Sequence, residues 1–385
     1  MLTRRRIIAA KLETTPGSAE TLAAEDAKLF AYDPKIAPAV DMFQRTPSRI
    51  GLNKLGQIAG KKALGFNFGI LLGGSGAATT TPEWGKLVQA CRNKINTYYS
   101  INIGAISDGP FLHGELITGG TSGVIGRVMI NTATGASAVL FVAVGSGTLE
   151  SAEVLTGGTS GATATTSSTP TATGKAIEPV SAPASMESLT MANFEDGFRK
   201  QLKGARGNLK LNYKTGEPGM MNFEFMGVEA GMADVALLSG ITHASTLPTP
   251  PAFLNASLSM AEYSALISEI EIDLGCVLAP STDANEERGI KLFQIVDANV
   301  VGSYDPEMVL AATHDFYANW FANTEMVLDF TLGSSSGNRS RFYAPRAQYI
   351  GLDDGDREGI ATVAANISIN SHDNLANTEY CILLS

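Results

Sequence analysis

One stretch of the chain, residues 194–227, constrains the fold more than any other. Apolar and polar residues alternate over residues 208–214, and the alternation resumes over residues 221–225. A period of two is typical of strands with one buried face. Between the two runs the sequence reads TGEPG, which favours a turn because glycine accepts positive φ and proline fixes its own φ. The sequence therefore predicts a β-hairpin here, with a second turn just upstream at Asp196 and Gly197.

The order of these segments also carries a family resemblance. An extended segment, a DG turn, GARGNLKL, a GE turn and FEFMG together resemble the major tail tube proteins of long-tailed (siphovirus-like) bacteriophages. In that family the chain folds into a β-sandwich with one flanking helix, and identical subunits form rings that stack into a DNA-conducting tube. The resemblance implies stacked rings of three or six chains and contacts with the terminator, tape measure and distal tail proteins. It also implies a location in the virion tail, after synthesis and assembly in the bacterial host cytoplasm.

Size and charge narrow the class of protein. A chain of 385 residues is too long for one ordinary domain, and its 40 glycines favour many turns, so we expect two or three mainly β domains. The net charge of −10, without a long block of like charge, argues against a grip on nucleic acid through its phosphates. The same charge suits a wall past which DNA slides only as cargo.

The compartment is indicated by what the sequence lacks. Cys91, Cys276 and Cys381 are isolated, which predicts buried free thiols rather than a disulfide framework or a zinc site. The apolar run near the amino terminus is only IIAA before Lys11, so we predict no secretion signal. No stretch approaches the roughly 20 apolar residues that a membrane span needs. We therefore expect a soluble protein with no membrane contact.

The first part of the chain predicts an arm, a strand and a helix. The resemblance makes residues 1–20 an arm that reaches a neighbouring subunit, and a frayed terminus is the alternative. Residues 63–72 alternate as a strand that ends in two glycines. Thr81 as N-cap, Pro82 and Glu83 then predict the start of a short amphipathic helix.

An internal repeat follows the helix. GELITGGTSGVIG at 114–126 recurs as AEVLTGGTSGATA at 152–164, with 38 residues (153 − 115) between Glu115 and Glu153. We predict that residues 108–180 form a small all-β insertion in a surface loop, which the resemblance places on the tube exterior. A flexible loop with marginal structure is the alternative.

The rest of the chain repeats the order of the first part. A proline-rich break at 247–253 precedes predicted strands, which a polar loop at 280–289 interrupts. Asp305, Pro306 and Glu307 predict a second capped helix, with Val309, Ala312, Phe316 and Trp320 at helical spacing. The strands predicted in this part span 269–274, 292–301, 326–332, 341–350 and 359–369.

These patterns predict a mainly β fold with a duplicated tail-tube-type β-sandwich or barrel. Each copy has one short α-helix, and the small all-β insertion interrupts the first copy. The domains would be 1–107 together with 181–246, then 108–180, and 247–385. A duplicated subunit could build a ring of six domains from three chains.

Candidate enzymatic motifs have simpler interpretations. GSSSG at 333–337 matches a nucleophile elbow, but the residues after it favour a strand, so a hairpin turn is preferred. GGTSG lacks the lysine and spacing of a phosphate-binding loop. LDDGDRE at 352–358 does not fit a calcium loop and is interpreted as a solvated turn. The four histidines have no metal-binding spacing: they are His113, His243, His314 and His372.

The prediction is thus a structural virion protein rather than an enzyme, with no catalytic, cofactor-binding or metal residues. By resemblance, the candidate contacts between subunits or rings are residues 1–20, 44–62 and 277–290. One alternative is a carbohydrate-binding or polysaccharide-degrading β protein, which would need a cleft with paired carboxylates or an exposed aromatic platform. The other alternative is a capsid decoration protein.

Overall fold

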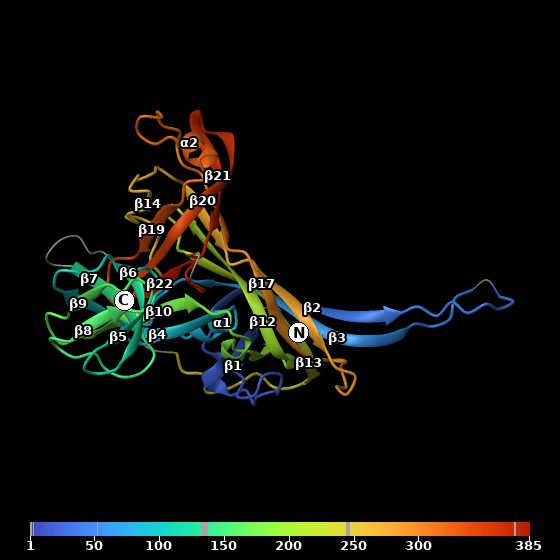
Figure 1. The fold of residues 1–385 in the computed structure, drawn as a ribbon. Coiled ribbons are helices and arrows are strands. Elements are labelled where there is room, and N and C mark those ends of the chain that lie inside the picture. The colour runs from blue at the N-terminus through green and yellow to red at the C-terminus, as the bar shows by residue number, and fades with distance from the viewer. Residues whose placement is uncertain (1, 3, 52, 132–137, 244–246, 373–374) are drawn as a thin grey trace.

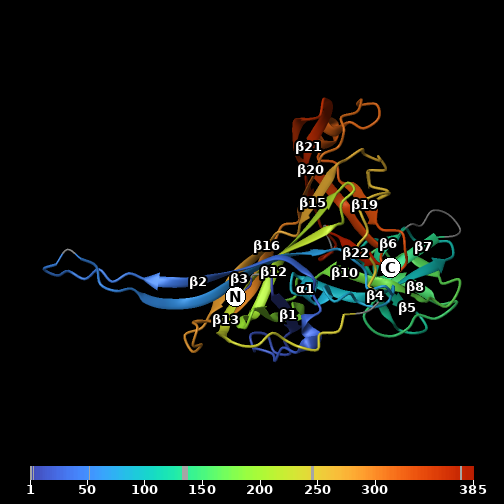
Figure 2. The same cartoon turned by 180° about the vertical axis from the view of Figure 1, so that it is seen from behind.

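The computed structural model describes the whole chain except residues 1, 3, 52, 132–137, 244–246 and 373–374. It has 51% of its residues in strands and 5% in helices, which confirms the mainly β prediction. Figures 1 and 2 show a body of packed strands. One projection of this body contains β20 and β21, and one long hairpin extends from it in another direction. Among the described residues, no helix combines the length and the apolar character needed to cross a membrane.

The described elements are short and long strands and two short α-helices. The first part of the chain forms β1 Arg6–Leu12, β2 Ala31–Phe43, β3 Ile58–Leu71, α1 Gly85–Gln89 and β4 Asn93–Ile103. The repeat region forms β5 Leu116–Gly119, β6 Ile125–Asn131, β7 Ala138–Val144, β8 Val154–Gly157, β9 Thr163–Thr165 and β10 Ala172–Pro179. Then come β11 Leu189–Glu195, β12 Phe198–Lys214, β13 Met220–Asp234, β14 Ser259–Met260, β15 Glu269–Asp273, β16 Cys276–Thr282 and β17 Ile290–Ala298. The last elements are β18 Val301–Tyr304, α2 Phe316–Phe321, β19 Met326–Leu332, β20 Ser340–Arg357, β21 Ile360–Ile369 and β22 Cys381–Leu384.

The predicted hairpin is confirmed as β12 and β13, which pair antiparallel with Leu209 opposite Phe223. It lies in the middle of what we name the central sheet, with the antiparallel strand order β2-β3-β13-β12-β15-β18-β21-β20. Because side chains alternate across a strand, one face of the central sheet is apolar and the other is polar. On β12, for instance, Leu209 and Leu211 are buried while Lys210 is partly exposed.

The apolar face of the central sheet builds the main core. Phe66 and Phe68 of β3 lie against Phe223 and Phe225 of β13, and the rings of Phe223 and Phe225 stack with centroids 5.7 Å apart. Each fully buried phenylalanine contributes about 2 kcal/mol of hydrophobic stabilisation. The same cluster reaches from Ile8 to residues near the end of the chain, so the two predicted halves share one core.

The strand β22 joins distant parts of the chain. It lies between β10 and β20, with Ile177 opposite Ile382 on one side and Phe342 opposite Ile382 on the other. All four of its residues are buried. The edge of the repeat region and the second half are therefore held together by the end of the chain.

The projecting hairpin of Figures 1 and 2 consists of β2 and β3 and is named the arm, residues 31–71. The strand β13 pairs with β3 only over residues 63–71, so the outer part of the arm extends past the central sheet. The hairpin of β16 and β17 reaches the base of the arm, where Lys62 N donates to Arg288 O at 3.2 Å.

Both predicted helix starts are wrong. Helix α1 begins at Gly85, after Trp84 rather than after Thr81, and no side chain caps it. Helix α2 begins at Phe316 with Asp315 as its cap, whose carboxylate accepts from Ala318 N. Asp305 is used differently, because its carboxylate accepts from the backbone N–H groups of Ser268 and Glu269 at the start of β15. At Asp305, tertiary hydrogen bonds therefore use the carboxylate that local capping rules had assigned to a helix start.

The expectations for the terminal arm and for two loops also need correction. Residues 6–12 are neither a free arm nor a frayed terminus, because β1 pairs with β11 along its whole length and Ala9 is fully buried. The loop predicted at 44–62 is shorter, since β3 begins at Ile58. The loop predicted at 277–290 is mostly strand, because β16 continues to Thr282.

Candidate functional site

The two halves of the chain meet at a strand pairing that we name the junction. There the end of β12 pairs antiparallel with β15, with Lys210 opposite Asp273 and Lys214 opposite Glu269. Lys210 Nζ lies 3.4 Å from an oxygen of Asp273, and Asn212 donates to Glu271 at 3.2 Å. Backbone pairing and side-chain complementarity therefore make the central sheet continuous across the two halves.

The central sheet ends in two edges that lack a strand neighbour within the described residues. The first is the outer edge of β2, which pairs only with β3 on its other side. The second is the end of β20, where residues 348–357 pair only with β21. Lys35 on β2 is exposed, and Asp353 on β20 is exposed. An unpaired edge presents backbone N–H and C=O groups that can bind another strand.

The outer part of the arm is basic and partly apolar. Residues 42–60 contain Arg45, Arg49 and Lys54 and no carboxylate. All three cations are exposed, as are Phe43 at 69% and Ile50, which is completely exposed. The outer part of the arm therefore exposes apolar side chains beside its cations.

The opposite end of the central sheet is acidic. The surface around the turns after β12 and β20 and the loop after β18 is named the acidic end. Its charged residues are Glu217, Glu269, Asp305, Glu307, Asp353, Asp354, Asp356 and Glu358, against the two cations Lys214 and Arg357. Both cations are already paired, Lys214 with Glu217 at 3.3 Å and Arg357 with Asp305 at 2.9 Å. A groove of about 430 Å³ opens here, lined by Lys214, Glu217, Glu269 and Asp305 among others.

The internal repeat forms two glycine-rich turns, and the glutamate of each copy binds the turn of the other copy. The carboxylate of Glu153, in the second copy, accepts hydrogen bonds from the N–H and hydroxyl of Ser122 in the first copy, at 2.6 and 2.7 Å. In return, Glu115 accepts from the N–H and hydroxyl of Ser160, both at 2.9 Å. Strands β5 and β8 pair antiparallel, with Thr118 opposite Thr156. The two copies are therefore related by a local two-fold arrangement in which each closes the turn of the other.

Both exchanged glutamates are fully buried. Burial raises the pKa of Glu153, but hydrogen bonds from the N–H of Glu150 and from Ser122 outweigh burial and lower it below its usual value. The carboxylate is thus held in its charged form by these donors.

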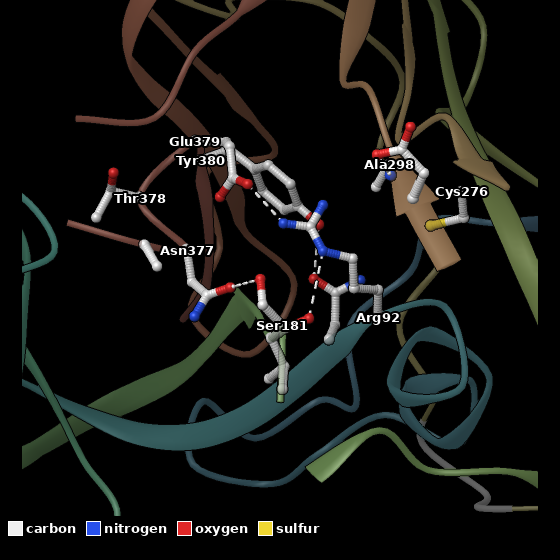
Figure 3. Close-up of polar contacts among 12 residues, drawn as sticks. Arg92, Ser181, Cys276, Ala298, Asn377, Thr378, Glu379 and Tyr380 are labelled. Atoms are coloured by element: carbon white, nitrogen blue, oxygen red, sulfur yellow. Dashed lines mark hydrogen bonds and ion pairs between the residues drawn. The ribbon is translucent and has the colours of Figure 1, made fainter. Parts of the chain in front are cut away.

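A second set of polar contacts joins the first half to the end of the chain (Figure 3). Arg92, which has a positive φ of 63°, donates to Val180 O at 3.2 Å and to Glu379 at 2.5 Å. Close by, Ser181 donates to Asn377 at 2.5 Å. These contacts position the segment that leads into β22.

His113 lies beside this segment and gives the fold a pH dependence. Its Nδ1–H donates to Met129 O, and burial, aided by nearby Arg127, lowers its pKa from 6.5 to about 4. The unfolded chain therefore binds a proton at His113 before the folded chain does, and stability falls as the pH drops from about 6.5 to 4. We expect a loss of about 3 kcal/mol over this range, measured by urea unfolding at each pH.

The variant His113→Gln tests this assignment, because glutamine keeps a donor for Met129 O but does not titrate. Its unfolding free energy should lose this part of the pH dependence. His243, which stacks on exposed Phe30 with centroids 4.3 Å apart, is the matched control position. An unchanged pH dependence in His113→Gln would contradict the assignment.

The GSSSG motif and the histidines His314 and His372 lie in a turn, in a packing contact and in a loop, respectively. GSSSG lies in the turn between β19 and β20, with Gly333 and Gly337 at positive φ, and a strand follows it rather than a helix. His314 packs against Tyr263 with ring centroids 4.7 Å apart and lies 3.1 Å from the hydroxyl of Tyr349. His372 begins the loop that precedes β22 and its backbone N–H donates to Thr378.

Two of the predictions need adjustment. The segment LDDGDRE, predicted as a solvated turn, mostly belongs to β20, which continues to Arg357, and only Glu358 lies in the turn. Its Arg357 binds Glu307 at 2.7 Å. Of the three free thiols, Cys91 and Cys381 are buried as predicted, while Cys276 is only partly buried.

Sequence reasoning missed the groups that matter most at these surfaces. The three cations of the arm went unnoticed because their segment was assigned to a polar loop. The exchange of Glu115 and Glu153 was missed as well, although each is the only charged residue in its copy of the repeat. A lone charge at the same position of two otherwise uncharged copies is a signal that could have found it.

Comparison with known protein families found no family model that matches the chain, and no curated protein matches it.

Proposed function

We propose that the chain is a structural subunit of a phage tail tube, which assembles with copies of itself into stacked rings through which genomic DNA passes. The observation that carries the proposal is the junction between β12 and β15, because it is a strand pairing that other copies can repeat. One chain leaves two matching edges free, one on β2 and one at the end of β20. Sheets that continue between subunits would satisfy both edges.

The strand order supports a duplicated fold. In the first half, β2 pairs with β3, β3 with β13 and β13 with β12. In the second half, β15 pairs with β18, β18 with β21 and β21 with β20, again all antiparallel. Under this correspondence β15 is equivalent to β2, and β20 is equivalent to β12. The contact of β20 with β2 of the next chain would then copy the junction, and three chains would close a ring of six equivalent units.

The same correspondence places Lys35 opposite Gly355 and diagonal to Asp353 across the contact between two chains, because Asn212 of the junction is equivalent to Gly355. Lys35 lies opposite Asn67, which lies opposite Glu224. Glu271 has the equivalent place, opposite Ser303, which lies opposite Asn366. Lys35 therefore takes the place of Glu271 in the junction, where it faces the acidic strand end of β20.

The polar face of the central sheet suits the wall of a DNA conduit. Its cation Lys210 is bound on both sides by carboxylates, Glu224 at 3.5 Å and Asp273 at 3.4 Å. A cation that carboxylates already neutralise offers DNA phosphates little affinity. The repeat region would lie on the outside, and the ends of the tube would contact the other tail proteins. The location would be the virion tail, with assembly in the host cytoplasm.

Microscopy of the purified chain tests the proposal. Negative-stain images should show rings and tubes, and native mass spectrometry should give the number of chains per ring. We expect Lys35→Glu and Asp353→Lys each to lower ring formation about tenfold, which is ~1.4 kcal/mol per contact. The double variant restores opposite charges across the contact and should recover the rings.

The outcome that counts against the proposal is a monomer at every concentration and salt level. In that case, reproducible binding in a glycan screen would favour a carbohydrate-binding protein. Assembly on capsids instead of self-assembly would favour a decoration protein.

A further inference from the structure

Two buried side chains hold the segment 308–323 to the second half of the chain. This segment runs from the loop after β18 through α2, which lies beside β20 (Figure 1). Its only buried residues are His314 and Phe316, while Leu310 and Phe321 are 81% and 75% exposed. A segment with so few buried contacts opens at a lower free-energy cost than the sheet beneath it.

His314 ends a chain of hydrogen bonds that starts in the central sheet. The hydroxyls of Tyr304, on β18, and Tyr349, on β20, lie 2.6 Å apart, and the Tyr349 hydroxyl lies 3.1 Å from His314 Nε2. All three side chains are buried. Tyr263 stacks on the imidazole with ring centroids 4.7 Å apart, and Phe316 meets it edge-on at 4.6 Å. The imidazole therefore lies among aromatic rings, with the Tyr349 hydroxyl as its hydrogen-bond partner.

Neutral His314 fits this chain of hydrogen bonds because the protons and the acceptors match. The Tyr304 hydroxyl donates to the Tyr349 oxygen, and the Tyr349 hydroxyl donates to His314 Nε2, so both hydroxyl protons are used. Protonated His314 has a hydrogen on Nε2 and must donate instead. Both bonds then reverse, and the buried Tyr304 hydroxyl, which has no other hydrogen-bond partner among the described residues, loses its acceptor.

The charges around His314 do not offset this cost. Three tyrosines and one carboxylate face it within the described part of the chain: Tyr263, Tyr304, Tyr349 and Asp315. Burial raises the pKa of each tyrosine, and Glu307 adds to this at Tyr263, so all three stay neutral. Burial also lowers the pKa of His314 from its ordinary value of 6.5, although Asp315 acts in the opposite direction. The open segment therefore binds a proton at His314 before the closed segment does, and opening becomes easier as the pH falls below 6.5.

We propose that His314 is a pH-sensitive latch, whose protonation releases residues 308–323 from the central sheet. Release withdraws Phe316 together with the histidine, because the two residues are almost adjacent in the chain, and it uncovers the ring of Tyr263. Mild acid thus changes which apolar surface the second half presents. The inference is independent of assembly into rings, since every contact that it uses lies within one chain.

Hydrogen exchange of the full chain tests the latch at about pH 7.5 and about pH 5, after correction for the intrinsic pH dependence of exchange. The lower value stays above the range near pH 4 in which carboxylates ordinarily titrate. The reporters are the amides of Asn319 and Ala322, which donate to Asp315 O and Ala318 O. Their protection should fall about fivefold or more at the lower pH. Amides of β12 and β13 should remain the better protected, because the sheet stays folded when the segment opens.

Two variants separate the latch from other contacts of the segment. In His314→Gln the side-chain oxygen can accept from the Tyr349 hydroxyl but the side chain does not titrate, so the fall in protection should disappear. Tyr317→Phe is the matched control, because it removes the exposed hydrogen bond to Asp354, 2.8 Å long, and leaves the latch intact. The fall in protection should persist in that variant.

The wild-type series decides the question even if His314→Gln does not fold. Equal protection of Asn319 and Ala322 at the two pH values would overturn the inference. Loss of protection in step with β12 and β13 would also overturn it, because the whole chain would then be unfolding. The same response in a folded His314→Gln would assign the pH dependence to another group. None of these results bears on ring formation, which microscopy tests separately.

Discussion

Alanine in place of Glu115 is expected to lower the free energy of unfolding by about 4 kcal/mol, because buried donors then lose their acceptor. Glu115 accepts from the backbone N–H groups of Leu112 at 2.6 Å and Ser160 at 2.9 Å, and its side chain is fully buried. Both donors then lack a protein acceptor, which leaves the cost of their partial burial uncompensated. Urea unfolding of the full chain measures the change.

A neighbouring glutamate provides the control. Glu150 is exposed, and Glu150→Ala should change the unfolding free energy by less than about 0.5 kcal/mol. The glycine that faces the carboxylate offers a second approach, since a Cβ at Gly157 would lie 2.8 Å from Glu115 Oε2. Gly157→Ala should therefore reproduce part of the loss. An unfolding free energy of Glu115→Ala within 1 kcal/mol of the wild type would show that the exchange contributes little.

The second large effect is expected at Gly174, on β10. A Cβ there would lie 1.9 Å from the carbonyl oxygen of Leu384 and 2.7 Å from a ring carbon of Tyr98. Because the first of these atoms belongs to the backbone of β22, the clash is relieved only if that strand moves. Gly174→Ala should cost about 3 kcal/mol or more, in the range of severe overpacking.

Gly145→Ala is the matched control, because a Cβ at that position meets nothing within 4 Å. Thermal unfolding would compare the two variants, and hydrogen exchange at β22 would show whether the strand is displaced. Equal melting temperatures for Gly174→Ala and Gly145→Ala would refute the tight packing of β10 against β22.

Local patterns were enough to predict elements whose two faces differ. The hairpin of β12 and β13 and the strand β19 alternate between core and polar face, so their periodicity was visible in the sequence. The strand β2 was missed for the opposite reason. It contains Pro34 and Pro38 and is exposed on both faces beyond Ile36, so no alternation marks it.

Features that depend on distant partners were beyond sequence reasoning. The helix after Pro82 starts late, and Asp305 binds the start of β15 instead of capping a helix. The repeat was recognised, but only the fold shows that each Glu closes the turn of the other copy. The charge contrast between the arm and the acidic end likewise needs the strand register, because its residues are scattered from Arg45 to Glu358.

The position of β22 has a consequence for the time course of folding. Ile382 pairs with Ile177, 205 residues earlier (382 − 177), so this part of the sheet closes through one of the most non-local contacts in the chain. Strands that are far apart in the sequence pair slowly, because the chain between them loses conformational entropy before the pairing stabilises the fold. While the chain is still being synthesised, the residues of β22 are not yet available to pair with β10 and β20. Until those residues arrive, the chain cannot complete this part of the sheet.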